Sequence, residues 1–292
     1  MQSQIDSHTG IAIDPMRARP VARVIKVLGS LVFYLLSESW RFCLRLAGRN
    51  PAPIVVCVYY HHVLNTERER FAAQMDSIVR WTTPLSSTAQ IPSTGGHYAM
   101  VTADDGWKSF ADNAVPELVK RAIPATIFVI SDRLSQTVDD ITADRIVSEA
   151  ELRDIGRVIT IGSHTATHPR MTLLSEADAR GELVESRARL EQFSATPVQA
   201  LCFPYGAFNQ ELVTLARDCG YRQIYVGVPI QDSKQNEPIG RFRVDPSNWG
   251  LEFHLKIVGA YRWVPMLSRL KRKVLAFKRD KQHLLLGRIT SV

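Results

Sequence analysis

Two adjacent carboxylates, Asp104 and Asp105, follow a run of small apolar residues and stand directly before a glycine, in the stretch "VTADDGWKSF". An Asp-Gly pair is a common way to end a strand and begin a turn, so the pair alone is equally compatible with a structural role. It becomes informative only if other residues able to share a metal or a proton occur elsewhere at suitable spacing.

Two histidines with such a spacing occur in "GSHTATHPRM", where His164 and His168 are four residues apart and Pro169 stiffens the exit. A helical or turn-like loop can aim both imidazoles at one point, although either could instead cap or fill the structure. Two imidazoles and one carboxylate hold a divalent metal with open positions, which is the pattern of a hydrolytic site. If one aspartate is the metal ligand, the other is free to act as a general base.

A third stretch, "CFPYGAFN", also follows an apolar run. Pro204 fixes a turn and Gly206 permits an unusual backbone angle, so an amide N–H there can serve as an oxyanion donor. Taken alone, an ordinary turn is the simpler interpretation. Its place in the series of strand ends is what favours a role in the site.

Short apolar runs alternate with amphipathic segments from about residue 54 onward. The runs are "PIVVCVYYHHV", "HYAMVTADDG", "ATIFVIS", "VITIGSHT", "VQALCFPYG" and "YRQIYVGV". The amphipathic segments are "WKSFADNAVPELVKRA", "SEAELRDIGR", "SEADARGELVESRARLEQF" and "NQELVTLARDCG", the third with a capped start at Ser175. This alternation predicts a parallel sheet, closed as a barrel or open, with its chemistry at the C-terminal ends of the strands.

In this order, the aspartate pair, the HxxxHP motif and the PYG turn resemble the polysaccharide deacetylase family, the NodB-homology domain of carbohydrate esterase family four. The resemblance covers roughly residues 54–245. It implies an α/β fold, a distorted (β/α) barrel with fewer units than the eightfold one, here with extra N- and C-terminal helices. We therefore expect the barrel over residues 51–250, a basic amphipathic extension over 1–50 and a basic helical extension over 251–292.

The resemblance also implies a function, the removal of N- or O-acetyl groups from an acetylated amino-sugar polymer or oligomer. Asp104 would be the general base, and Asp105, His164 and His168 would hold a divalent metal, commonly Zn²⁺. The backbone N–H of Tyr205 would bind the oxyanion of the tetrahedral intermediate. Attack by activated water explains why no serine or cysteine is placed as a nucleophile.

Two departures concern the first and third motifs. The first motif reads Thr-Ala-Asp-Asp, with Ala103 where the family usually has phenylalanine. Phe203 stands just before Pro-Tyr, where many members carry an arginine that orients the base. Arg241 or Arg243, in "IGRFRVDPSNW", could supply the missing charge, and we favour Arg243.

A third departure concerns the general acid, because the family's Leu-x-His motif is not evident. His254, in "LEFHLKIVGAY", is one candidate, although its helix-like surroundings are more typical of a structural histidine. His61 and His62, at the end of the first strand, are the other candidates.

The composition is that of an ordinary soluble domain, with 292 residues, 45% of them hydrophobic, and a net charge of +7 that is concentrated near both ends. Basic, apolar-interleaved ends can touch an anionic membrane surface or pack as solvated helices on their own domain. No nucleic-acid motif accompanies the charge, so we expect no nucleic-acid partner. The four widely spaced cysteines indicate free thiols.

The one candidate for targeting or insertion is "VIKVLGSLVFYLLSESW", whose uninterrupted apolar part, residues 27–36, is too short to span a bilayer comfortably. It resembles a signal sequence if translation starts at Met16, but no small-residue cleavage site follows. We expect an uncleaved interfacial or packed helix and a location in the cytoplasm or at the inner membrane face, with export left open.

Two other functions stay open at this point. A related hydrolase could act on a different non-peptide amide, with the residues lining its groove, such as Trp107, Tyr205 and Trp249, making the difference. A degenerate member could instead bind glycan or act as a scaffold at a membrane with little activity, as the missing Leu-x-His motif suggests.

Overall fold

The computed structural model describes residues 20–90, 92–93, 95–139, 144–194, 196–227 and 237–267 of the 292. The basic C-terminal tail predicted from the sequence lies outside the described residues from position 268 onward. Met16, Arg17 and Arg19 also lie outside them.

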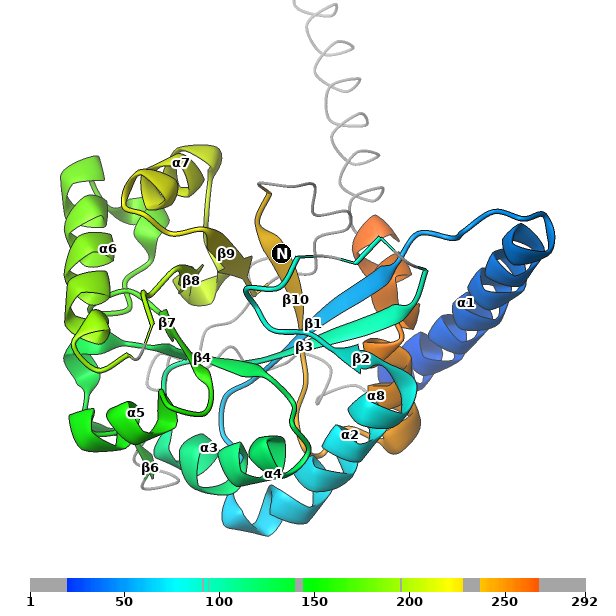
Figure 1. The fold of residues 1–292 in the computed structure, drawn as a ribbon, viewed down its shortest axis with the longest axis horizontal. Coiled ribbons are helices and arrows are strands. Elements are labelled where there is room, and N and C mark those ends of the chain that lie inside the picture. The colour runs from blue at the N-terminus through cyan, green and yellow to red at the C-terminus, as the bar shows by residue number, and fades with distance from the viewer. Residues whose placement is uncertain are drawn as a thin grey trace, which may run out of the picture.

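Seven parallel strands close into a ring in the order β1-β10-β9-β8-β7-β4-β3, with β3 pairing back to β1 (Figure 1). Their bounds are β1 Ile54–Tyr60, β3 His97–Ala103, β4 Ala125–Val129, β7 Thr160–Ser163, β8 Ala200–Cys202, β9 Gln223–Val226 and β10 Ile239–Arg243. The short β2 (Thr83–Pro84) pairs with the start of β3, and β5 (Thr137–Asp139) and β6 (Asp144–Arg145) form a separate antiparallel pair. The α/β barrel expected from the resemblance is confirmed.

The helices lie around the outside of the ring in Figure 1. Their bounds are α1 Pro20–Leu46, α2 Arg68–Trp81, α3 Lys108–Asn113, α4 Val115–Lys120, α5 Glu149–Ile155, α6 Glu176–Glu191, α7 Gln210–Asp218 and α8 Gly250–Ile257. The capped start of α6 is confirmed, because the Ser175 side chain accepts a hydrogen bond from the Asp178 backbone N–H. The predicted segment 107–122 forms two short helices in place of one, and α2 was not predicted.

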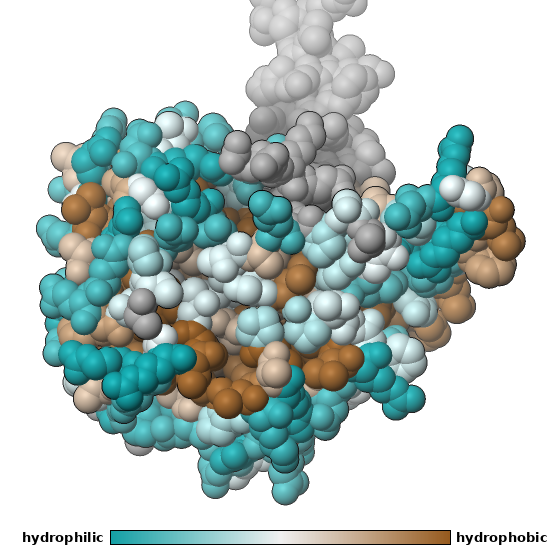
Figure 2. Space-filling view, in the orientation of Figure 1, coloured by the Kyte–Doolittle hydropathy of each residue, from teal (hydrophilic) through white to brown (hydrophobic). Residues whose placement is uncertain are grey.

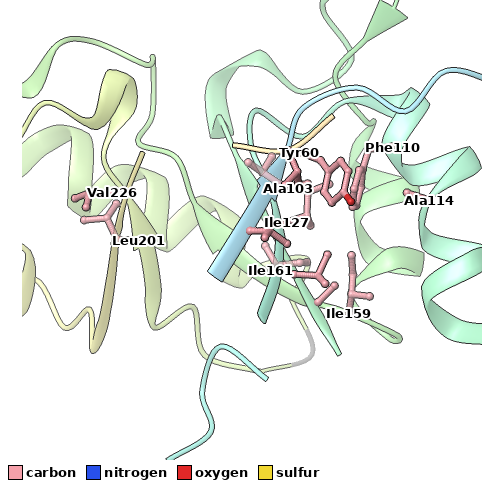
Figure 3. Packing of buried hydrophobic residues seen from close by; sticks show 14 of the residues in the cluster. Tyr60, Ala103, Phe110, Ala114, Ile127, Ile159, Ile161, Leu201 and Val226 are labelled. Atoms are coloured by element: carbon pink, nitrogen blue, oxygen red, sulfur yellow. The ribbon is translucent and has the colours of Figure 1, made fainter. Parts of the chain in front are cut away.

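Strand side chains divide between the barrel interior and the helix-facing layer, as their twofold alternation requires. Between the strands and the helices lies the larger apolar cluster, part of which Figure 3 shows around Tyr60, Ala103, Phe110 and Ile127. The barrel interior holds a smaller cluster of Cys57, Met100, Phe128, Ala200, Cys202 and Tyr225. Ala103 is fully buried and faces the helix layer, so the loss of a phenylalanine there affects packing and not the chemistry of the interior.

Helix α1 runs beside the barrel and contacts α8 and the turn that follows it. The helix has 27 residues. It is therefore longer than the apolar run of residues 27–36, which is too short to span a bilayer comfortably. By length and composition alone it could cross a membrane, and only 11% of its most apolar 18-residue window is buried. The helix is therefore longer than its apolar run indicated, and the expectation of an interfacial or packed helix stays a prediction.

Candidate active site

The two adjacent aspartates follow β3 and diverge toward different partners. Asp104 continues the strand, since its N–H donates to the carbonyl of Tyr60 at 3.0 Å. Asp105 has a left-handed φ of 69° and Gly106 a φ of 89°, so the chain turns sharply at this point. Because of this turn, consecutive carboxylates occupy separate environments at the mouth of the barrel, and the two can have separate chemical roles.

Asp104 forms a buried, two-point ion pair with Arg241. Nη1 and Nη2 of Arg241 donate to Oδ1 and Oδ2 of Asp104 at 2.7 and 2.8 Å, and Arg241 is fully buried. Burial by itself would raise the pKa of Asp104, but the Arg241 charge, the nearby histidines and the Arg241 hydrogen bonds outweigh it and lower that pKa. Asp104 is therefore ionised at neutral pH, as a general base has to be.

The guanidinium that contacts Asp104 belongs to Arg241, so the preference for Arg243 was wrong. Both residues occupy inward positions of β10, but Arg241 is in register with Cys57 and Arg243 with Tyr59, one inward position nearer the mouth. The long Arg241 side chain reaches upward from the deeper position to Asp104 and to the Thr102 hydroxyl, 3.0 Å away. The charge of Arg243 acts instead on Tyr59 and His61.

Asp105, His164 and His168 converge at the same end of the barrel. Nε2 of His164 and Nε2 of His168 lie 3.5 and 3.6 Å from Oδ1 of Asp105. One donor atom from each of the three lies within 4.8 Å of the others, which is close enough to hold one metal ion. The three residues that the resemblance assigned to the metal are thus brought together.

The chemical state of these three donors fits a divalent cation. Nδ1 of His164 lies 2.7 Å from the carbonyl of Cys202, which can only accept, so Nδ1 carries the proton and Nε2 keeps its lone pair for a metal. Burial and the proximity of His164 lower the pKa of His168 to about 4, so His168 is neutral. Burial would raise the pKa of Asp105, but its histidine neighbours and Trp107 lower it to about 2, so it is an anion.

A second group, Asp104, His164 and Cys202, also lies within 4.8 Å. It is a poorer cation site, because Nη2 of Arg241 is 2.8 Å from Sγ of Cys202 and its positive charge repels a metal. Burial also raises the pKa of the Cys202 thiol well above its usual value, whereas metal binding requires the thiolate.

Glu182 of α6 shapes the loop that carries the two histidines. Its carboxylate accepts hydrogen bonds from the backbone N–H groups of Ala166 and Thr167 at 2.8 and 2.9 Å. The Thr165 hydroxyl accepts from the N–H of His168 at 3.1 Å. With these bonds in place, Thr165 and His168 both adopt left-handed φ angles, 69° and 67°, which turn the second imidazole back toward the first. Sequence reasoning missed Glu182, since nothing in the pattern of α6 separates it from a solvated glutamate.

Trp107 and His62 support Asp105 from the side. The indole Nε1 of Trp107 donates to Oδ2 of Asp105 at 3.0 Å, and the Trp107 ring packs on His62 at a centroid distance of 4.2 Å. Nδ1 of His62 is in turn 3.0 Å from Asp144. Trp107 is 7% exposed, so it positions a carboxylate and does not line a groove as the sequence analysis suggested. The sequence feature that could have indicated this role is the position of Trp107, two residues after Asp105.

His61 lies at the site, whereas His254 does not. Nε2 of His61 is 3.9 Å from Oδ2 of Asp105, and about a third of the His61 side chain is exposed. His254 lies between the rings of Tyr34 and Trp81. Its electrostatic neighbour is His97, the first residue of β3, so His254 sits toward the N-terminal end of the strands. The assignment of His254 to catalysis is therefore corrected.

Tyr205 adjoins the metal ligands with a strained backbone. Its φ of 59° is left-handed, and its ring lies 4.7 Å from that of His168. The Arg170 guanidinium covers the Tyr205 ring at 5.3 Å, while half of the side chain stays exposed. Four side-chain-bearing residues around the site, Asp105, Thr165, His168 and Tyr205, thus hold φ values that such residues rarely adopt.

Residues 92–224, which include all three motifs, match the family model described as polysaccharide deacetylase. Over these residues the chain is similar to the polysaccharide deacetylase family. It is 23% identical over 228 residues to a Bacillus subtilis protein described as "Putative polysaccharide deacetylase YxkH", covering 72% of this chain and 76% of that one. The family is one of hydrolases acting on non-peptide carbon–nitrogen bonds.

Solved deacetylase structures share the fold. The Streptococcus pyogenes deacetylase PplD, solved in complex with acetate, superposes with a TM-score of 0.58 at 18% identity, covering 72% of this chain and 99% of that one. IcaB from Ammonifex degensii superposes with a TM-score of 0.56 at 22% identity, covering 70% and 98%. The chain therefore has the barrel fold of these deacetylases.

Proposed function

We propose that this protein removes acetyl groups from an N-acetylated, or O-acetylated, amino-sugar polymer or oligomer in a metal-dependent reaction. The observation that carries the proposal is the division of labour between two neighbouring aspartates. Asp104 is held by Arg241 as a buried anion, and Asp105 lies beside the Nε2 atoms of His164 and His168.

Asp105, His164 and His168 would hold the cation, with Zn²⁺ favoured by the two nitrogen donors and one carboxylate. Bound there, the metal would polarise the acetyl carbonyl and lower the pKa of water. At neutral pH Asp105 contributes an ionised donor and His168 a neutral one.

The protein groups then account for the movement of protons. Asp104 accepts a proton from water as its oxygen adds to the acetyl carbonyl, and the Tyr205 backbone N–H stabilises the oxyanion. The carbon–nitrogen bond breaks, the nitrogen takes a proton, and acetate and a free amine result. We assign the proton donor to His61. Of His61, His62 and His254, the three candidates for the general acid, His61 is the one whose ring nitrogen lies 3.9 Å from Asp105.

The electrostatics of His61 fit a relay. Burial lowers the pKa of His61, while Asp105 and Asp104 oppose that effect. The ring is therefore neutral in the resting site at neutral pH, and it has to receive a proton before passing one to the amine. Asp104, which has just accepted a proton from water, is one of its electrostatic neighbours.

The test is acetate release from a panel of N-acetylated and O-acetylated amino-sugar oligomers, with zinc, cobalt or a chelator added. We expect metal-dependent release that Asp104→Asn lowers by roughly a hundredfold or more. His254→Gln is the matched control, since that ring lies away from the site, and it should leave release within a few-fold of wild type.

The other functions are outcomes of the same experiment. Release of a different acid from a non-sugar amide, with none from the oligomers, would favour a related amide hydrolase. Tight metal binding without release from any substrate would favour a glycan-binding or scaffolding role, and it would refute the proposal.

A further inference from the structure

Polar contacts hold the N-terminal half of α1 to the barrel. Arg23 donates from Nε and Nη2 to Glu252 Oε2 of α8 at 2.8 and 2.6 Å, and the Glu252 side chain is 2% exposed. The same guanidinium lies 4.3 Å from the ring of Trp249. Farther along, Trp263 Nε1 donates to Ser30 Oγ at 2.9 Å.

The C-terminal half of α1 is docked in the same way. Glu38 Oε1 lies 3.1 Å from Nε2 of His97, and Arg41 Nη1 donates to the carbonyl of Ala52 at 2.6 Å. Arg41 is buried. The face of α1 that packs on the domain thus carries two arginines, a glutamate and a serine in specific contacts.

The opposite face of α1 is apolar and open to the surroundings, and Figure 2 shows it as a brown edge on the right of the molecule. We call it the outer face of α1. Its members are between 41% and 73% exposed, and they are Val21, Val24, Ile25, Leu28, Val32, Leu35, Leu36, Trp40, Phe42 and Leu46. Spaced mostly three or four residues apart, they form one stripe along the helix.

The arrangement of polar and apolar faces on α1 is the reverse of that usual for a helix on a water-exposed surface. A surface helix normally turns its apolar stripe to the core and its charged residues outward. Here Arg23, Glu38 and Arg41 contact the domain, and ten large apolar side chains face outward. A continuous exposed stripe of this kind marks a surface that something apolar covers.

We propose that the outer face of α1 lies in the plane of an anionic lipid membrane. The distribution of charged residues on α1 favours an anionic membrane over a second copy of the chain as the partner of this face. Glu38, the only acidic residue of α1, points inward to His97. Arg45 and Arg49 are exposed at the end that also carries Trp40, where basic and amphipathic aromatic side chains meet lipid headgroups.

The docking contacts also favour an in-plane helix over a spanning one. To cross the bilayer, α1 would have to leave α8 and expose Arg23 and Arg41 to lipid, while Glu252 would lose a partner in the domain. In the plane of the membrane it keeps every one of these contacts and immerses only the outer face.

Flotation of the purified full-length chain with phosphatidylglycerol–phosphatidylcholine vesicles tests the proposal. We expect binding that the triple substitution Leu28→Gln, Val32→Gln and Leu35→Gln reduces by about tenfold or more, because three apolar side chains that would enter the lipid are lost. The matched control, Val79→Gln, Val119→Gln and Val184→Gln, changes three equally exposed residues on other helices and should bind as wild type does. Unchanged thermal unfolding would show that both triple variants are folded.

A pair of single variants separates lipid from protein as the occupant. Val32→Lys and Val32→Glu remove the same apolar side chain, but the glutamate should bind anionic vesicles more weakly than the lysine by more than about tenfold. Three results would overturn the proposal. These are equal binding of the two variants, a wild-type dimer that the triple substitution turns into a monomer without any vesicle binding, and retention in native membranes after alkaline carbonate washing, which indicates a spanning helix.

Discussion

Removing Arg241 should leave Asp104 as a buried carboxylate without a partner. The guanidinium makes two hydrogen bonds of 2.7 and 2.8 Å to a carboxylate that is 6% exposed. Breaking such a pair from one side costs about 3–5 kcal/mol, because the remaining charge stays buried. We therefore expect Arg241→Met to lower the free energy of unfolding at pH 7 by this amount, measured by urea denaturation with chelator present in every sample.

The loss of unfolding free energy in Arg241→Met depends in part on pH. In the wild type the pKa of folded Asp104 lies below 3.8, so the pair contributes stability above that pH and loses it as pH falls through the folded pKa. In Arg241→Met burial is opposed only by the weaker effect of the nearby histidines, so the pKa of Asp104 rises above its ordinary value. The difference in unfolding free energy between the wild type and Arg241→Met should thus be largest near pH 8 and become smaller toward pH 5.

The double variant Arg241→Met, Asp104→Asn is the decisive control. It removes both charges, so it should be more stable than the sum of the two single losses predicts, by about 2 kcal/mol or more. Its stability relative to wild type should not change between pH 5 and pH 8. Additive losses, or a penalty in Arg241→Met that is the same at pH 5 and pH 8, would refute the assignment of Arg241 as the partner of Asp104.

Three further outcomes are expected. His61→Asn should slow acetate release from N-acetylated oligomers about a hundredfold, yet leave p-nitrophenyl acetate hydrolysis nearly unchanged because that leaving group departs without a proton; equal losses on both substrates would contradict a donor role. Glu182→Ala should weaken zinc binding about tenfold or more in a chelator competition, whereas Glu185→Ala on the same helix should not, and parallel behaviour of the two would argue against the loop contacts of Glu182. Trp107→Phe keeps the ring packed on His62 but removes the donor to Asp105, so zinc affinity should fall about tenfold, with undiminished affinity counting against that hydrogen bond.

The residues that could be predicted from the sequence are those placed by local rules. Asp105, His164 and His168 each follow an apolar run, and the C-terminal ends of parallel strands meet at one mouth. The six strands predicted from apolar runs correspond to β1, β3, β4, β7, β8 and β9. The roles of Tyr205 and of the metal stay predictions until they are tested.

The residues that were misplaced depend on relations between distant strands. Arg241 and Arg243 share an inward face, and only the register of β10 against β1 decides which one reaches Asp104. His254 belongs to a helix whose direction takes it toward the start of β3, which a local pattern does not reveal. The apolar run in α1 gave neither the full length of the helix nor its reversed polarity, because both depend on what packs against it.

The left-handed residues around the site carry a conformational cost that the rest of the fold has to offset. Asp105, Thr165, His168 and Tyr205 each hold a conformation that costs on the order of 1–3 kcal/mol, against a typical total stability of about 5–15 kcal/mol. Glycine adopts such angles without that cost, but at Asp105 or His168 it would remove a side chain that converges on the proposed metal position. Strain at this mouth of the barrel is therefore the cost of presenting these side chains together, and the packing of the rest of the fold offsets it.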